Sequence, residues 1–470
     1  MMADLTALSL VEVAEAVRSK QTSAVEVTEA CLAAIEQAQP RLNCFVKLEA
    51  ERALAAAHTL DDELARGHVR GPLHGVPLAH KDLLYRQGQP ITCGSKVLDG
   101  FVANETASSL ERLEAAGAIY LGALNMAEIA LGPSGRNEHV GHCHNPWKPD
   151  HITGGSSSGS GASVAARLAY GALGTDTGGS IRIPSAICGL VGLKPTQGRV
   201  TRHGVMPLSS SLDNLGPMTR TIADNARLLG VLAGHDSRDP LSSTELVPDY
   251  EAGLAAVDMT GLRIAVPTDY FYDVADPSVT AALLASLDVY RDLGATVIET
   301  KFGDQERIRH LTSLLIRVEG ASVHARWLEH EPELFSTEIR ERLETGLYVP
   351  AVRYLEALRL RGPLAREFCE RMFALADVIH LPGVAIATPS LASLEDAMNT
   401  DAPRINDRLA WCTRAINYYG LPGLGVPCGF ANGLPVGFQL VGRPFSEARL
   451  YQIGEAYQRA TDWHRQAPPL

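Results

Sequence analysis

The sequence predicts an α/β protein, and three observations support that prediction. Short apolar runs that read as buried strands alternate along the chain with longer amphipathic stretches that read as helices. Of the 470 residues, 46% are hydrophobic and 20% are charged, which is the balance of a globular protein with a full core. Glycine and proline separate most of these segments, so the turns between them are marked as well.

The first forty residues predict two amphipathic helices, each of which begins with a capping box. Ser9 is followed three positions later by Glu12, and Ser23 is followed in the same way by Glu26. In such a box the serine hydroxyl and the glutamate carboxylate each accept a backbone N–H group that the helix leaves unpaired. The pattern therefore predicts where both helices start.

Further helices and strands follow in alternation up to residue 300. Helices are predicted over residues 53–66, 108–116, 162–170, 221–233 and 277–293. Buried strands are predicted over residues 118–123, 189–193, 262–266 and 296–299. A short apolar segment, 78–84, contains His80, Lys81 and Asp82. A lysine among apolar neighbours is usually a surface residue with a buried stem, so Lys81 on its own is weak evidence of a function.

Residues 303–376 differ in composition from the chain before them. They are rich in charged and helix-forming residues and poor in glycine. We expect one domain over residues 1–470, with residues 303–376 as a variable helical insertion or cap within it. After this stretch the apolar segments 377–381, 421–429 and 434–442 follow, and a closing helix is predicted over 448–460.

Charge and cysteine content disfavour several classes of function. The formal net charge is −12 without any cluster of lysines and arginines, which argues against nucleic acid as a direct partner. No apolar run is long enough to span a bilayer, and residues 1–15 are acidic and periodic, so we expect neither a membrane segment nor a signal peptide. The eight cysteines show no C-x-x-C pair and no disulfide spacing, which is typical of a reducing cytoplasm.

Residues 151–196 hold two clusters of glycine and serine, 154–159 and 178–180. A structural turn would explain one such cluster but not two. A phosphate-binding loop is disfavoured, because neither the P-loop pattern nor a G-x-G-x-x-G fingerprint is present. Ser157 stands at the centre of a G-x-S-x-G match, but such a match arises easily in a run of serines, and no clear strand leads into it.

The fourth interpretation of these clusters is a nucleophilic serine held in a glycine turn. The segment Thr177-Gly178-Gly179-Ser180 can direct several backbone N–H groups toward one point, as an oxyanion hole requires. A serine hydroxyl needs a base before it can attack an amide. Neither cluster contains a histidine, but a lysine can be the base where burial disfavours its charged form. Lys81 is the candidate for that base.

Several long motifs stand in a defined order along the chain. They are HGVPLAHKD at 74–82, LGALNMAEIALG at 121–132, NPW at 145–147, GGSSSGS, GTDTGGSIRIPS and CGLVGLKPT within 154–196, SLDNLGPMTRT at 211–221, and GLPGLGVPCGF and GLPVGFQLVG near the C-terminus. Together they closely resemble the amidase signature family of serine hydrolases. The resemblance covers about residues 5–235 and 375–465, whereas residues 240–375 match only loosely. It implies a large mixed sheet sandwiched by helices.

The resemblance also implies a Ser-cisSer-Lys triad. Lys81 stands at the lysine position of its motif, Ser156 is the first serine after two glycines, and Ser180 closes GTDTGGS. Neutral Lys81 would accept a proton from Ser156, which would take the proton of Ser180 while Ser180 attacks the carbonyl carbon. A cis peptide bond between Gly155 and Ser156 is implied by the same resemblance.

The turn around the predicted nucleophile would supply the oxyanion hole. Its donors are expected to be the backbone N–H groups of Thr177, Gly178, Gly179 and Ser180. Asp176 and Arg182 flank this turn, and we expect them to form a structural ion pair that braces it rather than to be catalytic.

A histidine cluster just before NPW could suggest a metal site. His139, His142, Cys143 and His144 lie close together, but they match no established zinc spacing. We therefore expect no metal there and no metal or organic cofactor for the reaction.

The resemblance leaves two main alternatives for the substrate. The family contains free-standing amidases for small amides, fatty amides, peptides and carbamoyl compounds, and also the glutaminase subunit of tRNA-dependent glutamyl or aspartyl amidotransferases. SLDNLGPMTRT and GLPVGFQLVGRPF are similar to that subunit, and Arg342 is a candidate for its carboxylate-binding arginine. The subunit is expected to carry an acidic residue about ten positions before the C-terminal G-L-P, where this chain has Ala410.

On the strength of Ala410 we favour a stand-alone hydrolase of a small amide or carbamoyl substrate. The amidotransferase subunit is the alternative, and a catalytically inactive binding homologue is a third interpretation. The acyl pocket is expected to be built from residues 303–376 and from residues near 131–137. The sequence is compatible both with a homo-oligomer and with binding of a small accessory subunit.

Overall fold

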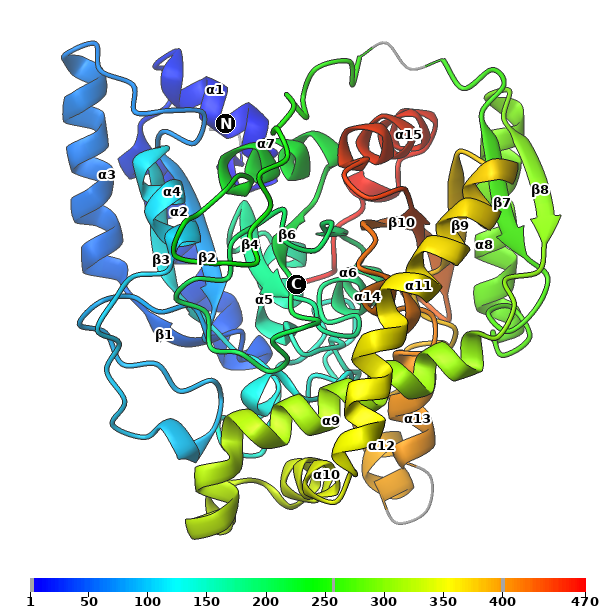
Figure 1. Ribbon diagram of the computed structural model, residues 1–470. Helices are drawn as coiled ribbons and strands as arrows, with labels where there is room; N and C mark the ends of the chain where they lie inside the picture. The colour runs from blue at the N-terminus through cyan, green and yellow to red at the C-terminus, as the bar shows by residue number, and fades with distance from the viewer. Residues whose placement is uncertain (1–3, 256–257, 399–401) are drawn as a thin grey trace.

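An eleven-stranded sheet forms the centre of the computed structural model (Figure 1), in the order β1-β3-β2-β4-β6-β5-β10-β11-β9-β7-β8. The structure describes residues 4–255, 258–398 and 402–470, so residues 1–3 of the expected domain lie outside the description. The strands are β1 Phe45–Leu48, β2 Val76–Lys81, β3 Ala118–Leu124, β4 Gly171–Thr175, β5 Val191–Lys194, β6 Leu215–Thr219, β7 Arg263–Pro267, β8 Thr296–Thr300, β9 Val378–Pro382, β10 Gly423–Ala431 and β11 Leu434–Val441.

The described residues form fifteen α-helices, some of which pack on the sheet and others on neighbouring helices (Figure 1). They are α1 Leu10–Arg18, α2 Ala24–Leu42, α3 Ala50–Ala65, α4 Ser108–Ala115, α5 Ser158–Ala165, α6 Arg182–Cys188, α7 Ile222–Leu232, α8 Pro277–Asp292, α9 Gln305–His330, α10 Thr337–Leu347, α11 Ala351–Leu375, α12 Leu391–Met398, α13 Ala402–Leu409, α14 Arg414–Tyr419 and α15 Glu447–Ala460. None of them is long and apolar enough to cross a bilayer.

The sheet is mixed. β2 is parallel to both β3 and β4, and β7 is parallel to both β8 and β9, whereas the remaining neighbours are antiparallel. The predicted fold class, a large mixed sheet sandwiched by helices, is confirmed. Every residue of β2, β4, β5 and β6 is buried, as expected for strands that are covered on both faces.

The two capping boxes at the N-terminus are present as predicted. In α1 the Ser9 hydroxyl accepts the N–H of Glu12 at 3.1 Å, and the Glu12 carboxylate accepts the N–H of Ser9 at 2.7 Å. Ser23 and Glu26 form the same pair of bonds at the start of α2. Both helix starts were readable because each depends on residues within one turn.

The predicted helix over 162–170 lies earlier in the chain than expected, as α5. It begins at Ser158, directly after the first glycine and serine cluster, and its last residue is Ala165. Arg167 then adopts a positive φ of 59°, which a helix cannot continue through.

Strand β4, which sequence analysis did not predict, depends on its glycines. A Cβ at Gly171 would lie 2.9 Å from Leu228 of α7, and a Cβ at Gly174 would lie 2.8 Å from the Ser157 hydroxyl. Only residues without a side chain let these neighbours approach so closely. Because β2 and β4 are parallel neighbours, their C-terminal residues, Lys81 and Thr175, meet at the same edge of the sheet.

Residues 303–376 contain α9, α10 and α11; in the view of Figure 1, α11 passes in front of the sheet and α10 lies below it. α9 packs on α10, α11 and α14. A second core cluster, separate from the one around the central strands, is formed by apolar residues of α9, α11, α14 and β9, among them Leu315, Phe368, Met372, Leu381 and Ile416.

Candidate active site

Lys81, the last residue of β2, is buried against two hydroxyl groups. Its Nζ lies 2.7 Å from Ser156 Oγ and 2.9 Å from Thr175 Oγ1. Ser156 lies just before α5, and Thr175 ends β4. The structure thus brings Lys81 and Ser156 into direct contact, and it adds Thr175, which the sequence did not single out.

The environment of Lys81 favours a neutral amine near pH 7. The residue is 1% exposed, and burial lowers the pKa of its amine from 10.5 to about 7. The negative charge of Asp213 opposes this shift only in part. A neutral amine has a lone pair that can accept a proton from a hydroxyl, so Lys81 has both the contact and the pKa of a base.

Ser156 is fixed by the backbone around it. The peptide bond between Gly155 and Ser156 is cis, as the family resemblance implies. The N–H of Gly155 donates to the carbonyl of Pro133 at 2.8 Å, and the carbonyl of Ser156 accepts the N–H of Ala127 at 3.0 Å. A Cβ at position 155 would collide with the carbonyl oxygen of Gly132, so only glycine fits there.

A buried ion pair braces the turn between β4 and α6. Asp176 and Arg182 are both 0% exposed, and Arg182 donates to the Asp176 carboxylate from Nε at 3.0 Å and Nη2 at 2.9 Å. The same carboxylate accepts the backbone N–H of Gly179 at 2.8 Å. Arg182 also donates to Asn417 at 2.6 Å and to Gln439 at 2.8 Å, which ties the turn to α14 and β11.

This pair keeps Asp176 ionised. Burial alone would raise the pKa of its carboxyl, but the charge and hydrogen bonds of Arg182 outweigh burial, and the pKa falls to about 2. The stabilisation from this lowered pKa is present above the ordinary value of 3.8 and is lost as the pH falls toward about 2.

Replacing Arg182 with methionine is expected to destabilise the fold strongly. The change leaves the Asp176 carboxylate buried without its partner, which costs about 3–5 kcal/mol of unfolding free energy. Urea-induced unfolding measures the loss. Arg353→Met is the control, because the Arg353 side chain is 66% exposed and, among the residues that the structure describes, pairs with Glu356 alone. An Arg182→Met protein as stable as that control would contradict a bracing role.

Ser180 lies half-buried within the braced turn. Within the described ranges, its hydroxyl and the backbone N–H groups of Thr177, Gly178 and Ser180 form no hydrogen bond, whereas the N–H of Gly179 is used by Asp176. Three donors are therefore available to an incoming oxygen, and no hydrogen bond joins Ser180 to Ser156. Catalytic hydrogen bonds are often long in free enzymes and shorten when substrate binds.

Side chains of α9 and α14 lie beside Gly178. A Cβ at Gly178 would lie 3.3 Å from Ile316 of α9 and 3.5 Å from the side chain of Arg414 in α14. Arg414 in turn donates to Asp407 at 2.7 Å. Arg342 of α10 reaches the carbonyl of Leu131 at 3.4 Å. The hydroxyl of Thr413 also donates to the carbonyl of Gly178 at 2.6 Å, so the turn is contacted by an apolar, a cationic and a neutral polar side chain.

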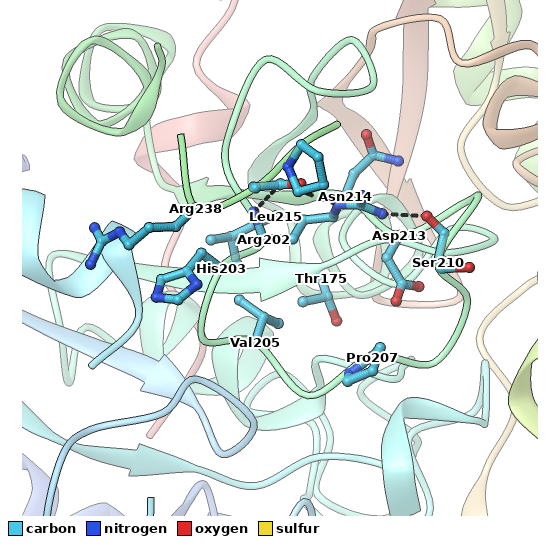
Figure 2. A pocket seen from close by; sticks show the side chains of 12 residues that line it. Thr175, Arg202, His203, Val205, Pro207, Ser210, Asp213, Asn214, Leu215 and Arg238 are labelled. Carbon is cyan, nitrogen blue, oxygen red and sulfur yellow. Dashed lines mark hydrogen bonds and ion pairs between the residues drawn. The ribbon is translucent and has the colours of Figure 1, made fainter. Parts of the chain in front are cut away.

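A pocket of about 250 Å³ opens on the other side of Thr175 (Figure 2). Figure 2 shows Thr175, Val205, Pro207 and Asp213 among the side chains that line it, with Arg202 bound to the backbone of Ser210. The remaining lining residues are His203, Asn214, Leu215, Arg238, Asp239 and Pro240. Thr175 lines this pocket and also contacts Lys81, which is not itself one of the lining residues.

The histidines before NPW are used in separate contacts. His139 lies 3.0 Å from a carboxylate oxygen of Glu128, His142 accepts the N–H of Asn137, and His144 lies 2.6 Å from the carbonyl of Pro149. In the part of the chain that the structure describes, no three histidine, cysteine, aspartate or glutamate side chains are grouped as metal ligands.

A family model described as Amidase matches residues 26–451. The chain belongs to the amidase family. As a member of that family it is a hydrolase that acts on carbon–nitrogen bonds of amides.

Three relatives of this amidase-family chain illustrate the range of the family. It is 40% identical to the A-type subunit of the glutamyl-tRNA(Gln) amidotransferase of Chloroflexus aurantiacus, over 100% of both chains. It is 33% identical to a chain of a vestigial protein complex related to the origins of an s-triazine catabolic enzyme, with a TM-score of 0.89 and coverage of 96% and 98%. It is 30% identical to the peptide amidase of Stenotrophomonas maltophilia, with a TM-score of 0.85 and 98% of both chains covered.

Two residues of the amidase site escaped sequence analysis although their motifs were recognised. Thr175 stands in GTDTGGS and Asp213 in SLDNLGPMTRT. Thr175 ends β4, which runs parallel to the strand that ends with Lys81, so its position could have indicated a contact with the lysine. Sequence analysis missed it because β4 itself was not predicted. The partner of Asp213 is Thr177, whose hydroxyl donates to the carboxylate across the two motifs.

Proposed function

We propose that this chain cleaves an amide through an acyl-enzyme on Ser180, with Ser156 and Lys81 as the proton relay. The observation that supports this best is the contact of 2.7 Å between the Lys81 amine and the Ser156 hydroxyl, inside a site where burial lowers the amine pKa to about 7. A solvent-exposed lysine would be protonated and could not accept the proton.

The proposed reaction proceeds in two halves. Neutral Lys81 takes the proton of Ser156, and Ser156 takes the proton of Ser180 as the Ser180 oxygen bonds to the carbonyl carbon. The carbonyl oxygen becomes an oxyanion, which the N–H groups of Thr177, Gly178 and Ser180 bind. The C–N bond then breaks, and ammonia or an amine leaves after it takes a proton back through Ser156. Water enters, loses a proton to the same relay and releases the acid.

Gly179, which we expected among the oxyanion donors, is left out of this set. Its N–H already donates to Asp176 at 2.8 Å, so a substrate oxygen would have to compete with a buried carboxylate for it. Asp176, Arg182 and Gly155 hold the site in shape and do not take part in proton transfer.

Among the substrates of the family, we infer glutamine. On this hypothesis the chain is the A-type glutaminase subunit of a tRNA-dependent glutamyl or aspartyl amidotransferase and passes ammonia to a partner subunit. Identity of 40% over 100% of both chains to a protein named as such a subunit supports this hypothesis. The likeness to a chain from a protein complex supports a partner as well. These comparisons favour the subunit over the stand-alone hydrolase that the sequence alone favoured.

A stand-alone amidase is the second candidate, and Ala410 favours it. This residue is 4% exposed and has no charge with which to hold the α-ammonium group of glutamine. The acidic residue next before it, Asp407, is paired with Arg414 at 2.7 Å. The likeness to a peptide amidase over 98% of both chains supports the same hypothesis.

A panel of amides tests both candidates. The purified chain, alone and after copurification with any small partner, is given glutamine, a carbamoyl compound, an aryl amide and an ester, and ammonia or amine release is measured. Ammonia from glutamine that depends on a copurified subunit supports the first candidate. Turnover of another amide by the chain alone supports the second. No turnover, together with a Ser180 that a fluorophosphonate does not label, would mean an inactive binding homologue.

The rate is expected to depend on the ionisation of Lys81. Because the base must be neutral, kcat/KM should rise with pH, bend near the lysine pKa of about 7 and stay level above it. Below the bend the rate should fall about tenfold per pH unit. A pH–rate profile measured with an uncharged amide tests this. A flat profile between pH 5 and pH 9 would contradict a lysine base.

We also propose that residues 303–376 form a cap over a single domain. Ile316 of α9 beside Gly178 supports this proposal, and Arg342 of α10 contacts the carbonyl of Leu131 in the segment expected to line the acyl pocket. The eight cysteines are all free thiols, which supports a reducing cytoplasm as the location.

A further inference from the structure

Thr177 has two roles in the turn that carries Ser180. Its backbone N–H is one of the three available donors for an oxyanion. Its hydroxyl donates to a carboxylate oxygen of Asp213, a bond that both partners make while buried. The donor N–H and the hydroxyl belong to the same residue, so the bond to Asp213 restricts the direction in which the N–H points.

Asp213 is itself held firmly. The carboxylate oxygen that does not bind Thr177 accepts the backbone N–H groups of Leu208 and Ser209, both at 2.9 Å. Both oxygens are therefore used in hydrogen bonds from the protein. This leaves Asp213 suited to hold its neighbours and unsuited to exchange protons with a substrate.

The loop that carries these donors is in turn tied to the helical region. Glu319 of α9 accepts the hydroxyl of Ser209, and the N–H of Ser211 at 3.1 Å. The other oxygen of Glu319 accepts the hydroxyl of Tyr354 in α11 at 3.0 Å. A continuous set of hydrogen bonds therefore runs from α11 through α9 and the loop 208–213 to Thr177.

We propose that Asp213 is a positioning residue for the oxyanion hole, which fixes Thr177 through its hydroxyl while Glu319 fixes the loop that carries Asp213. This inference rests on the proposed acyl-enzyme on Ser180. On this proposal the helices α9 and α11 also help to position the turn, because Glu319 of α9 and Tyr354 of α11 hold the loop that carries Asp213. Glu319 acts only through this loop and touches no reacting atom.

Thr177→Val tests the inference most cleanly, because it keeps the backbone N–H and removes only the hydroxyl. The probe is a fluorophosphonate, whose phosphoryl oxygen needs the same N–H donors when Ser180 attacks phosphorus and fluoride leaves. We expect the labelling rate constant of Ser180 to fall about 10- to 100-fold, the effect of a small misplacement in a catalytic site. Thr177→Ser retains a hydroxyl and is expected to restore the rate to within about threefold of the wild type.

A matched control and a second variant separate this role from a structural one. Thr28→Val removes a buried hydroxyl that bonds only within α2, to the carbonyl of Ala24, and should label at the wild-type rate. Asp213→Asn removes a negative charge that raises the pKa of Lys81. The pKa of Lys81 should therefore fall in this variant, and the bend in the pH–rate profile of the variant should move to lower pH.

Several outcomes would overturn the inference. A Thr177→Val protein that labels at the wild-type rate would contradict it. So would a slower labelling rate that is explained by a lower melting temperature and that Thr177→Ser does not restore. A wild-type Ser180 that takes no label would refute the proposed nucleophile itself. That failure is distinct, because it appears before any variant is compared.

Discussion

Replacing Ser180 with alanine is expected to lower kcat on any substrate of the enzyme at least about 10⁴-fold, because no oxygen is left to form the acyl-enzyme. The folded structure should persist, since the hydroxyl of Ser180 forms no hydrogen bond within the described residues. Ammonia or amine release measures the loss, and a thermal melt confirms the fold. Binding of substrate should survive, so that the effect appears in kcat and not in KM.

Ser185→Ala is the matched control for this experiment. Ser185 is a buried serine of α6 whose hydroxyl has no partner in the described part of the chain, so its loss should cost little activity. Full activity in Ser180→Ala, with a loss in Ser157→Ala, would instead place the nucleophile in the G-x-S-x-G match that sequence analysis set aside.

Replacing Lys81 with methionine is expected to lower kcat at least about 10³-fold at every pH. Methionine fills a similar volume in the buried site but has no group that accepts the proton of Ser156. Raising the pH should not restore activity, whereas the wild type gains rate up to its bend near pH 7. Steady-state rates between pH 6 and pH 10 measure both effects.

Lys194 supplies an internal control for Lys81. It is 0% exposed, and burial lowers the pKa of its amine to about 7 as well. Its Nζ donates to the carbonyl of Pro195 at 2.7 Å and forms no hydrogen bond to a serine hydroxyl in the part of the chain that the structure covers. We expect Lys194→Met to keep the bend of the pH–rate profile. If that variant lost the bend and Lys81→Met kept it, the base would be Lys194.

Sequence analysis predicted best those elements whose signals are local. The starts of α1 and α2 follow from Ser9 with Glu12 and from Ser23 with Glu26, all within a single turn of chain. Strand β4 was missed for the opposite reason. Its sequence, GALGT, has little preference for a strand, and its conformation depends on pairing with β2 and β6 and on the closeness of α5 and α7.

In the candidate site, too, residues that stand in local motifs were predicted, whereas features that depend on contacts between distant segments were not. Lys81, Ser156 and Ser180 were found because each stands in a motif that resembles the amidase signature, and the structure links the first two directly. The direction of the N–H of Gly179 could not be read from the motif, since it depends on how the Asp176 carboxylate turns within the fold. The bond from Thr177 to Asp213 depends likewise on how two distant loops meet.

The ties of Arg182 to Asn417 and Gln439 have a consequence for synthesis of the protein. These partners lie 235 and 257 residues further along the chain than Arg182. A nascent polypeptide still on the ribosome lacks them until translation has passed β11, and the turn of Ser180 is without its brace until then. The enzyme should therefore become active only when nearly all of the chain has been synthesised.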